Sequence, residues 1–185
     1  MGIYKRIGAV LAVIVLSGCA VQNFNSYVSP NRPQIEKLLV VSLTSSYHDA
    51  NLQEQEFCDT LDSQKITCLT TEGYRKPGFN FSPDNALKLS EREKVDHVLL
   101  VGLISSDSIN ESMLIQSGSQ TQIINGISEQ KLFQIQLTSM LSGEVVYSAE
   151  VETEYGKVTA DFQKRTFYGQ IFEEVVTDWK QKGIH

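Results

Sequence analysis

The stretch Val98-Leu99-Leu100-Val101 decides the fold, together with the earlier run Lys37-Leu38-Leu39-Val40-Val41-Ser42-Leu43. Continuous apolar runs of this length are typical of strands that are covered on both faces of a sheet. The first stretch is the centre of the segment Val95 to Ile104. Between the two runs lie a helical pattern, a short strand pattern at 66–70 and a second helical pattern. The order strand, helix, strand, helix, strand predicts crossover connections and neighbouring parallel strands.

The two helices predicted between these strands begin at recognisable capping residues. Asn51, with Glu54 three residues later, has the spacing of a capping box and predicts a helix that continues to about residue 63. Ser82-Pro83 predicts the start of the second helix, because proline is tolerated at the first helical position. This helix is expected to end at about Lys94.

An antiparallel hairpin is predicted in the second half of the chain, with a definite register. Apolar residues alternate with polar ones on both sides of Ser142-Gly143, and the pairing must place apolar opposite apolar. A two-residue loop fails this test. A three-residue loop over 141–143 pairs Leu137 with Tyr147 and places Gly143 where a positive φ is needed. The same register pairs Ile135 with Ala149 and Phe133 with Val151.

The chain ends in a segment, 159–181, with one apolar stripe at helical spacing. The stripe predicts an amphipathic helix that covers the sheet, and its members are Phe162, Tyr168, Ile171, Phe172, Val175, Val176 and Trp179. The predicted fold class is therefore α/β with a mixed α+β sheet, namely β-α-β-α-β followed by an antiparallel hairpin and a C-terminal amphipathic helix.

The N-terminal residues have the order of a secretory signal. Lys5 and Arg6 precede an apolar run over 7–16, and Leu16-Ser17-Gly18-Cys19 closes it. This ending resembles the lipobox of bacterial lipoproteins. The resemblance implies that residues 1–18 are a signal peptide, that Cys19 carries the lipid, and that Ala20 directs the protein to the outer membrane. The alternative is an ordinary secretory peptide that contains a cysteine.

The length and net charge of the remaining chain limit the number of domains and the kinds of partner that it can have. Removing 1–18 from 185 residues leaves 167, which suits a lipidated Cys19 with a flexible tether over 19–35 and one periplasmic domain over 36–185. The signal holds two of the 16 Lys and Arg residues, so the remainder has a net charge near −8 (14 minus 22). Such a surface repels phosphate backbones, so no nucleic-acid partner is expected, and membrane attachment must come from the lipid.

Two further cysteines, Cys58 and Cys68, are close enough in sequence to form a disulfide in an oxidising periplasm. The alternative is a pair of buried thiols that pack as small hydrophobic residues.

The sequence contains no residue set that is typical of a reaction. His48 and His97 are expected at opposite ends of the sheet, so no metal site, cofactor or catalytic residue is predicted, and the chain is not expected to be an enzyme. No Gly-x-Ser-x-Gly element is present. The alternating row Glu150, Glu152 and Glu154 indicates a solvated outer face that blunts pairing at a sheet edge.

The polar segment 105–128 is longer than the fold requires, and it is either a solvated hairpin or a mobile loop. It contains two apolar doublets, Met113-Leu114 and Ile123-Ile124, which are expected to bind a partner protein.

Two passages resemble known periplasmic domains. These are Ala86-Leu87-Lys88-Leu89-Ser90 followed by Val95-Asp96-His97-Val98-Leu99-Leu100-Val101-Gly102, and Leu141-Ser142-Gly143-Glu144-Val145-Val146-Tyr147-Ser148-Ala149. They are similar to motifs of the superfamily that includes curli-secretion lipoproteins, lipoprotein activators of peptidoglycan synthases and the amino-terminal domain of TolB. The resemblance implies a small α/β domain that binds other envelope proteins and performs no reaction.

Together these observations predict an outer-membrane lipoprotein, on the periplasmic rather than the cell-surface side. Its expected role is that of a non-enzymatic adaptor in a secretion, pilus, flagellar or cell-wall complex, and association with further copies of the chain is left open. The alternatives are a carrier of a small ligand and an envelope hydrolase.

Overall fold

The structure, a computed structural model, describes residues 20–61, 66–78, 81–117, 120–156 and 161–184. The predicted signal peptide and Cys19 therefore lie outside the described residues. The described elements, in chain order, are β1 (Ala20–Val28), β2 (Lys37–Ser42), α1 (Tyr47–Leu61), β3 (Thr67–Leu69), α2 (Pro83–Glu93), β4 (His97–Ser117), β5 (Gln120–Ser139), β6 (Val145–Gly156) and α3 (Asp161–Lys182).

The strands form one six-stranded mixed sheet in the order β1-β6-β5-β4-β2-β3. Strand β2, next to the edge strand β3, runs parallel to both β3 and β4, whereas β4, β5, β6 and β1 pair antiparallel in succession. The parallel strands from the first half of the chain are thus joined to an antiparallel hairpin from the second half. This arrangement confirms the predicted fold class.

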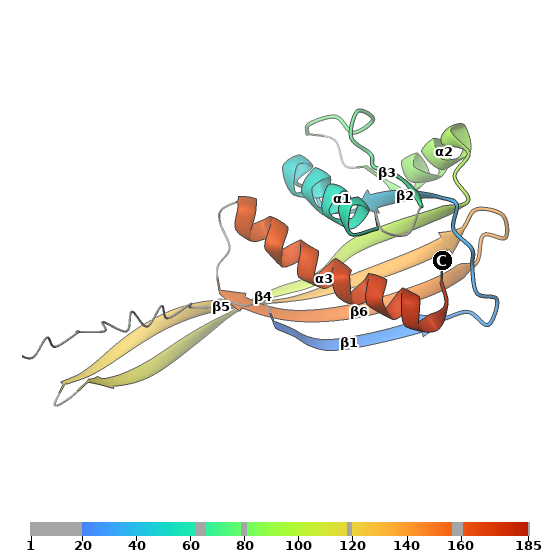
Figure 1. Ribbon diagram of the computed structural model, residues 1–185. Coiled ribbons are helices and arrows are strands. Elements are labelled where there is room, and N and C mark those ends of the chain that lie inside the picture. The colour runs from blue at the N-terminus through green and yellow to red at the C-terminus, as the bar shows by residue number, and fades with distance from the viewer. Residues whose placement is uncertain (1–19, 62–65, 79–80, 118–119, 157–160, 185) are drawn as a thin grey trace, which may run out of the picture.

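Helices cover the two faces of the sheet unequally (Figure 1). Alternate residues of β2 divide between two cores: Leu38 and Val40 join the core under α1 and α3, whereas Leu39 and Val41 join a smaller core under α2. Burial of β2 on both faces explains why its sequence is continuously apolar. The beginning of β4 is divided in the same way, with Leu99 and Val101 in the larger core and Val98 in the smaller one, whereas β5, β6 and β1 have an exposed second face. Gln134, Glu150 and Asn25 are register partners on β5, β6 and β1, and all three are exposed.

Trp179 of α3 is the centre of the larger core. Its ring centroid lies 5.7 Å from that of Phe57 on α1 and 5.7 Å from that of Tyr147 on β6, both in edge-on geometry. Phe57 in turn lies 5.1 Å from Phe172. The stripe predicted for the C-terminal helix is therefore the face that packs on the sheet, with Tyr168, Ile171, Phe172, Val175, Val176 and Trp179 all buried. The surroundings of Phe162, the first residue of the predicted stripe, lie outside the described part of the structure.

The register predicted for the β5–β6 hairpin is confirmed away from its turn. Leu137 pairs with Tyr147, Ile135 with Ala149, and Phe133 with Val151. Gly143 has a φ of +72°, as the turn requires. Next to the turn an irregularity between Leu137 and Thr138 shifts the pairing by one residue, so that Thr138 opposes Val145.

The first helix begins four residues before the predicted capping box. Ser46 caps α1, because its side-chain Oγ accepts a hydrogen bond from the Asp49 amide at 3.2 Å. Asn51 lies in the second turn, and Glu54 is buried rather than turned back to a helix end. The second predicted cap is confirmed. Ser82, which precedes Pro83, accepts a hydrogen bond from the Asn85 amide through its side chain.

The N-terminal segment that was expected to be a flexible tether is in part a strand. Residues Ala20–Val28 form β1 and pair with β6 along its whole length, apart from one irregularity between Val21 and Asn23. Phe24 and Val28 pack against the larger core. Contacts of these apolar side chains with the core therefore accompany the addition of β1 to the sheet.

No helix among the described residues is long and apolar enough to cross a membrane.

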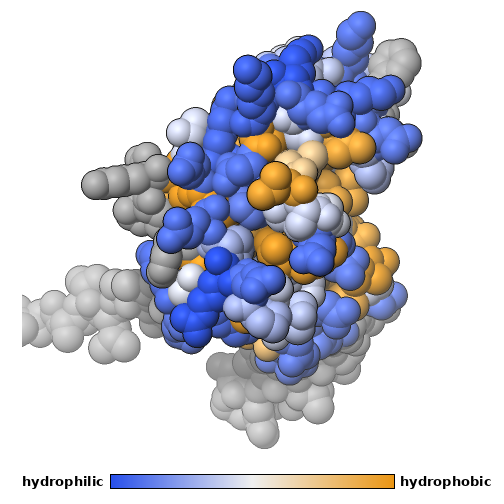
Figure 2. Space-filling view, turned by 90° about the vertical axis from the view of Figure 1, so that its right-hand side faces the viewer, coloured by the Kyte–Doolittle hydropathy of each residue, from blue (hydrophilic) through white to orange (hydrophobic). Residues whose placement is uncertain are grey.

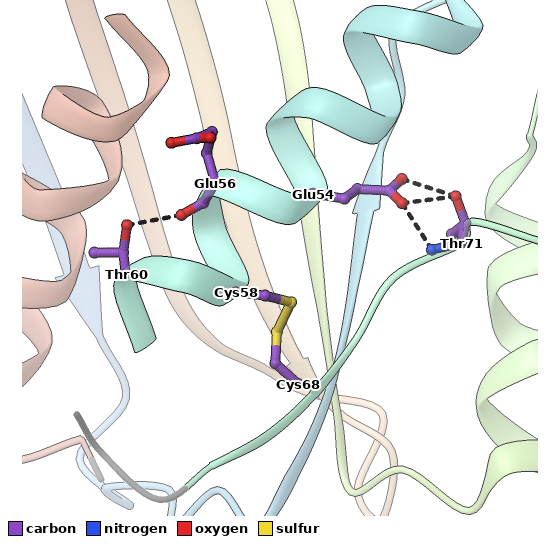
Figure 3. The surroundings of a disulfide bond; sticks show 6 residues. All are labelled: Glu54, Glu56, Cys58, Thr60, Cys68 and Thr71. Atoms are coloured by element: carbon purple, nitrogen blue, oxygen red, sulfur yellow. Dashed lines mark hydrogen bonds between the residues drawn. A yellow bond between two sulfur atoms is a disulfide. The ribbon is translucent and has the colours of Figure 1, made fainter. Parts of the chain in front are cut away.

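A disulfide joins Cys58 of α1 to Cys68 of β3, so the helix is linked covalently to the short edge strand (Figure 3). The bond closes a loop with a sequence separation of 10. In the chain-entropy description, a loop of this size stabilises the fold by about 2–3 kcal/mol.

The double variant Cys58→Ser, Cys68→Ser is expected to lose this 2–3 kcal/mol from the free energy of unfolding, because its unfolded chain is no longer constrained. Urea unfolding followed by the fluorescence of the single tryptophan measures the change. A reducing agent serves as the control, since it should lower the midpoint of the wild type and leave that of the variant in place. Identical midpoints for the two proteins under oxidising conditions would contradict the prediction.

Candidate functional site

The longest strands of the sheet, β4 and β5, continue together beyond the other strands as a two-stranded arm (Figure 1). They pair with each other from His97–Ser139 to Ser117–Gln120. Among the described residues, β2 pairs with β4 only as far as Val101, and β6 pairs with β5 only as far as Ser128. Beyond the pair Ile109–Ser128, both outer edges of the arm lack a described neighbouring strand.

The free part of the arm comprises eight residue pairs, from Asn110–Ile127 to Ser117–Gln120. At 3.3–3.4 Å per residue it projects about 26 Å from the last three-stranded pair. The segment 105–128, for which the sequence left a hairpin and a mobile loop open, is thus a hairpin in the structure, with residues 118 and 119 outside the described part.

The register brings together the four apolar residues that were predicted to bind a partner. Met113 pairs with Ile124, and Leu114 pairs with Ile123. The four residues therefore form two adjacent pairs at the middle of the free arm, although the two doublets are about ten residues apart in the sequence.

The chain enters the sheet where the arm leaves it. Ala20, the first described residue, pairs with Glu154, which pairs with Gln130, which pairs with Asp107. These four residues lie in one row across β1, β6, β5 and β4. Ala20 therefore lies near the root of the arm.

A polar hollow of about 330 Å³ lies beside this root, on the face of the sheet opposite α1 and α3. Its carboxylates are Asp107, Glu150 and Glu152, and its one cationic side chain is Lys131. The amide of Asn23 donates a hydrogen bond of 2.6 Å to Glu152, and Gln22 likewise donates to Glu154.

The row Glu150, Glu152 and Glu154 thus lies on an outer face, as predicted, but it does not blunt a sheet edge. Strand β1 covers β6 on that side, and β1 is itself the edge strand.

A buried ion pair lies at the end of β2, and no local pattern in the sequence predicts it. Glu54 and Arg75 are joined at 3.0 Å, with side chains only 0% and 2% exposed. Glu54 also accepts hydrogen bonds from the amides of Ser42 at 2.9 Å and Thr71 at 2.7 Å. Figure 3 shows Glu54 directed from α1 toward Thr71, on the opposite side of the helix from Glu56. One carboxylate thus joins three segments that are distant in sequence: the end of β2, α1 and the turn over 71–75.

The pKa of Glu54 is raised by burial, and the hydrogen bonds from Ser42 and Thr71 and the charge of Arg75 oppose that rise. The hydrogen bonds from Ser42 and Thr71, together with the charge of the guanidinium, therefore favour the ionised form of this carboxyl inside the fold. Arg75 also donates to the carbonyl oxygen of Ser42 at 2.5 Å.

The two histidines with described surroundings lie apart in the topology. His97 pairs with Leu38 at the beginning of β2, whereas His48 lies in the first turn of α1, after β2 has ended. The ring of His97 lies 2.9 Å from Asp96, which also accepts from the amide of Glu36.

The pKa of Asp96 is lowered, because these hydrogen bonds outweigh the effect of partial burial. Within the described ranges, no group of three or more His, Cys, Asp or Glu side chains is placed to hold a metal ion.

Comparison with solved structures finds similar folds at low sequence identity. PelC from Paraburkholderia phytofirmans, solved as a dodecamer, is 11% identical, with a TM-score of 0.51 over 85% of this chain and 98% of PelC. The lipoprotein GNA1162 from Neisseria meningitidis is 12% identical, with a TM-score of 0.46 over 79% of this chain and 99% of its own. Protein XCC0632 from Xanthomonas campestris is also 12% identical, with a TM-score of 0.37 over 82% of this chain and 86% of its own.

No protein-family model and no curated protein matches the chain. At this level of identity, the likeness to PelC shows the fold alone.

Proposed function

We propose that this chain is a non-enzymatic lipoprotein of the cell envelope, held at the outer membrane through Cys19, which assembles with further copies of itself through the β4–β5 arm. The observation that carries the proposal is the arm itself, whose free part has two strands and no described neighbour on either edge.

Along both of its outer edges, the free part of the arm has backbone groups that are unpaired among the described residues. An isolated two-stranded hairpin is marginally stable in water, and unpaired strand edges present rows of amide and carbonyl groups that another strand can bind. Addition of a neighbour's strand would complete those hydrogen bonds. The pairs Met113–Ile124 and Leu114–Ile123 supply hydrophobic residue types to the same stretch, which favours burial in an interface.

A second copy is the partner that the proposal selects. The two edges of the arm differ, because one belongs to β4 and the other to β5, so the edge of one copy can pair with the opposite edge of the next. A head-to-tail contact of this kind generates a ring when the rotation closes. PelC, which has the same fold, was solved as a dodecamer, and this supports testing self-assembly first.

The position of the anchor fits the same role. The row from Ala20 to Asp107 puts the residue after Cys19 at the root of the arm, so lipid on Cys19 would hold every copy by the same end. The body would then lie next to the bilayer instead of on a long tether.

The test is to replace Asn110–Ile127 by the dipeptide Asn-Gly, which closes the hairpin after the pair Ile109–Ser128 and leaves the three-stranded part of the sheet intact. The lipidated chain in detergent is expected to form oligomers. The shortened chain is expected to be monomeric, with an unchanged circular dichroism spectrum apart from the lost strands. Light scattering after size-exclusion chromatography measures the mass of each.

Leu141→Ser is the matched control, because this turn residue is 97% exposed and lies at the opposite end of β5. Its oligomeric mass should equal that of the wild type. Oligomers of unchanged mass in the shortened chain would refute the proposal, as would a monomeric wild type that is cross-linked in cells only to a different protein.

A further inference from the structure

A second surface feature, unrelated to the arm, is an open cleft of about 680 Å³ between α2 and the loop that follows β3. Helix α2 contributes Asn85, Lys88 and Arg92, which are spaced three and four residues apart and so lie on one side of the helix. The facing wall consists of residues 73–76, and Leu89 and Phe81 complete the lining. The upper part of Figure 2, where Figure 1 places α2 and this loop, is mostly hydrophilic.

The charge of the cleft is opposite to that of the protein. The whole chain has a net charge of −6, yet the lining contains four cations, Arg75, Lys76, Lys88 and Arg92, and no carboxylate. Arg75 is paired with Glu54, and Arg92 with Glu93 at 3.2 Å. Lys76 and Lys88 are exposed and have no ion-pair partner among the residues that the structure describes. The cleft therefore retains at least two uncompensated positive charges.

The wall of the cleft formed by residues 73–76 is fixed by a turn and by the buried pair of Arg75 with Glu54. A tight turn brings the amides of Tyr74 and Arg75 to the carbonyl oxygen of Thr71, each at 3.0 Å, and Gly73 supplies the positive φ of +86° that the turn needs. The turn sends Arg75 inward to Glu54 and leaves Tyr74 with 44% of its surface exposed. The guanidinium of Arg92 lies 4.5 Å from the centre of the Tyr74 ring, across the cleft from its own helix.

We infer that this cleft binds an anionic saccharide, that is, a sugar that carries carboxylate or phosphate groups. Lys76 and Lys88 would bind the anionic groups from opposite walls, and Asn85 would hydrogen-bond to hydroxyl groups. Tyr74, which has the Arg92 guanidinium over one face of its ring, would contact a sugar ring with the other face.

The size and composition of the cleft favour this class over others. Its volume lies within the range typical of small-molecule sites. Only Phe81 and Leu89 are apolar in its lining, which is too little for a lipid chain. A nucleic acid would bring closely spaced phosphates against an acidic protein, whereas a short saccharide places one or two charges at the cations alone.

The inference can be tested by calorimetric titration of the full chain with trigalacturonate, a carboxylated oligosaccharide, and with glucose 6-phosphate. At least one of the two is expected to bind. The double variant Lys76→Gln, Lys88→Gln should weaken binding about tenfold or more, because it removes both uncompensated charges. Tyr74→Ala should weaken it about fivefold through loss of the ring contact. The stronger of the two ligands shows whether carboxylate or phosphate is preferred.

The control variant Lys180→Gln, Arg165→Gln removes the same number of charges from α3, away from the cleft, and its binding should equal that of the wild type. Maltotriose, which is neutral, should not bind. Three results would overturn the inference: no titration by either anionic sugar, equal weakening by the control variant, or binding of inorganic phosphate alone as strong as that of the sugars. None of these results bears on self-assembly through the arm.

Discussion

Arg75→Met is expected to lower the free energy of unfolding by about 3–5 kcal/mol at neutral pH, because it leaves the carboxylate of Glu54 buried without a counter-charge. Burial already raises the pKa of this carboxyl, and Arg75 is one of the groups that oppose the rise. In the variant, the folded state can retain Glu54 only by protonating it. Urea unfolding monitored through the fluorescence of Trp179 measures the loss.

The pH dependence of this loss has a definite sign. A carboxyl whose pKa is higher in the folded than in the unfolded state stabilises the fold most below its unfolded value, 4.5 for Glu54, and that contribution falls as the pH rises through the folded pKa. The penalty in Arg75→Met should therefore shrink as the pH is lowered from 7 toward 4.5. A penalty that does not change with pH would show that lost packing, and not the unpaired charge, is responsible.

Arg92→Met is the matched control for Arg75→Met. Both arginines pair with a glutamate and lie over an aromatic ring, but the side chain of Arg92 is 59% exposed whereas that of Arg75 is 2% exposed. An exposed ion pair contributes about 0–1 kcal/mol, so Arg92→Met should be nearly neutral. The double variant Glu54→Leu, Arg75→Met should recover most of the stability lost in Arg75→Met, since it removes both buried charges.

Trp179→Ala is expected to lower the free energy of unfolding by about 3–5 kcal/mol, because it opens a cavity where α1, α3 and β6 meet. The ring is fully buried and packs on Phe57 and Tyr147. Since the variant lacks tryptophan, its unfolding is followed by circular dichroism.

Trp179→Phe separates the volume of this side chain from its polar atom. The indole Nε1 is buried and has no hydrogen-bond partner among the described residues, so loss of the N–H should cost nothing and the smaller ring only about 1–2 kcal/mol. Lys180→Ala, at the neighbouring exposed position, should stay within about 0.5 kcal/mol of the wild type. Equal losses in the alanine and phenylalanine variants would indicate that the N–H has an essential partner after all.

Local patterns in the sequence predicted those elements whose contacts are local or strictly periodic. The alternation around Gly143 was enough to set the register of β5 and β6, and Ser82-Pro83 marked the beginning of α2. The capping box at Asn51 and Glu54 failed for a tertiary reason: Glu54 is used by Arg75, which is 21 residues away, and Ser46 takes over the cap. Nothing in the spacing of Asn51 and Glu54 distinguishes these two uses.

The sites were predicted less completely than the fold. The segment 105–128 was recognised by its excess length and apolar doublets, but its pairing as an arm depends on the long register between β4 and β5. Strand β1 was missed because residues 20–28 show neither a continuous apolar run nor a strict alternation, and a strand at the sheet edge needs apolar side chains on one face only. The cationic cleft was missed because its charges come from two segments that no local pattern connects.

The pairing of Ala20 with Glu154 leaves no slack between the proposed lipid and the sheet. On this anchoring, every molecule in the leaflet is held by the same end, so neighbours approach with their arms at a similar height above the bilayer. Association then forfeits far less rotational freedom than it would between untethered molecules, and contacts too weak to persist in solution become sufficient at the surface.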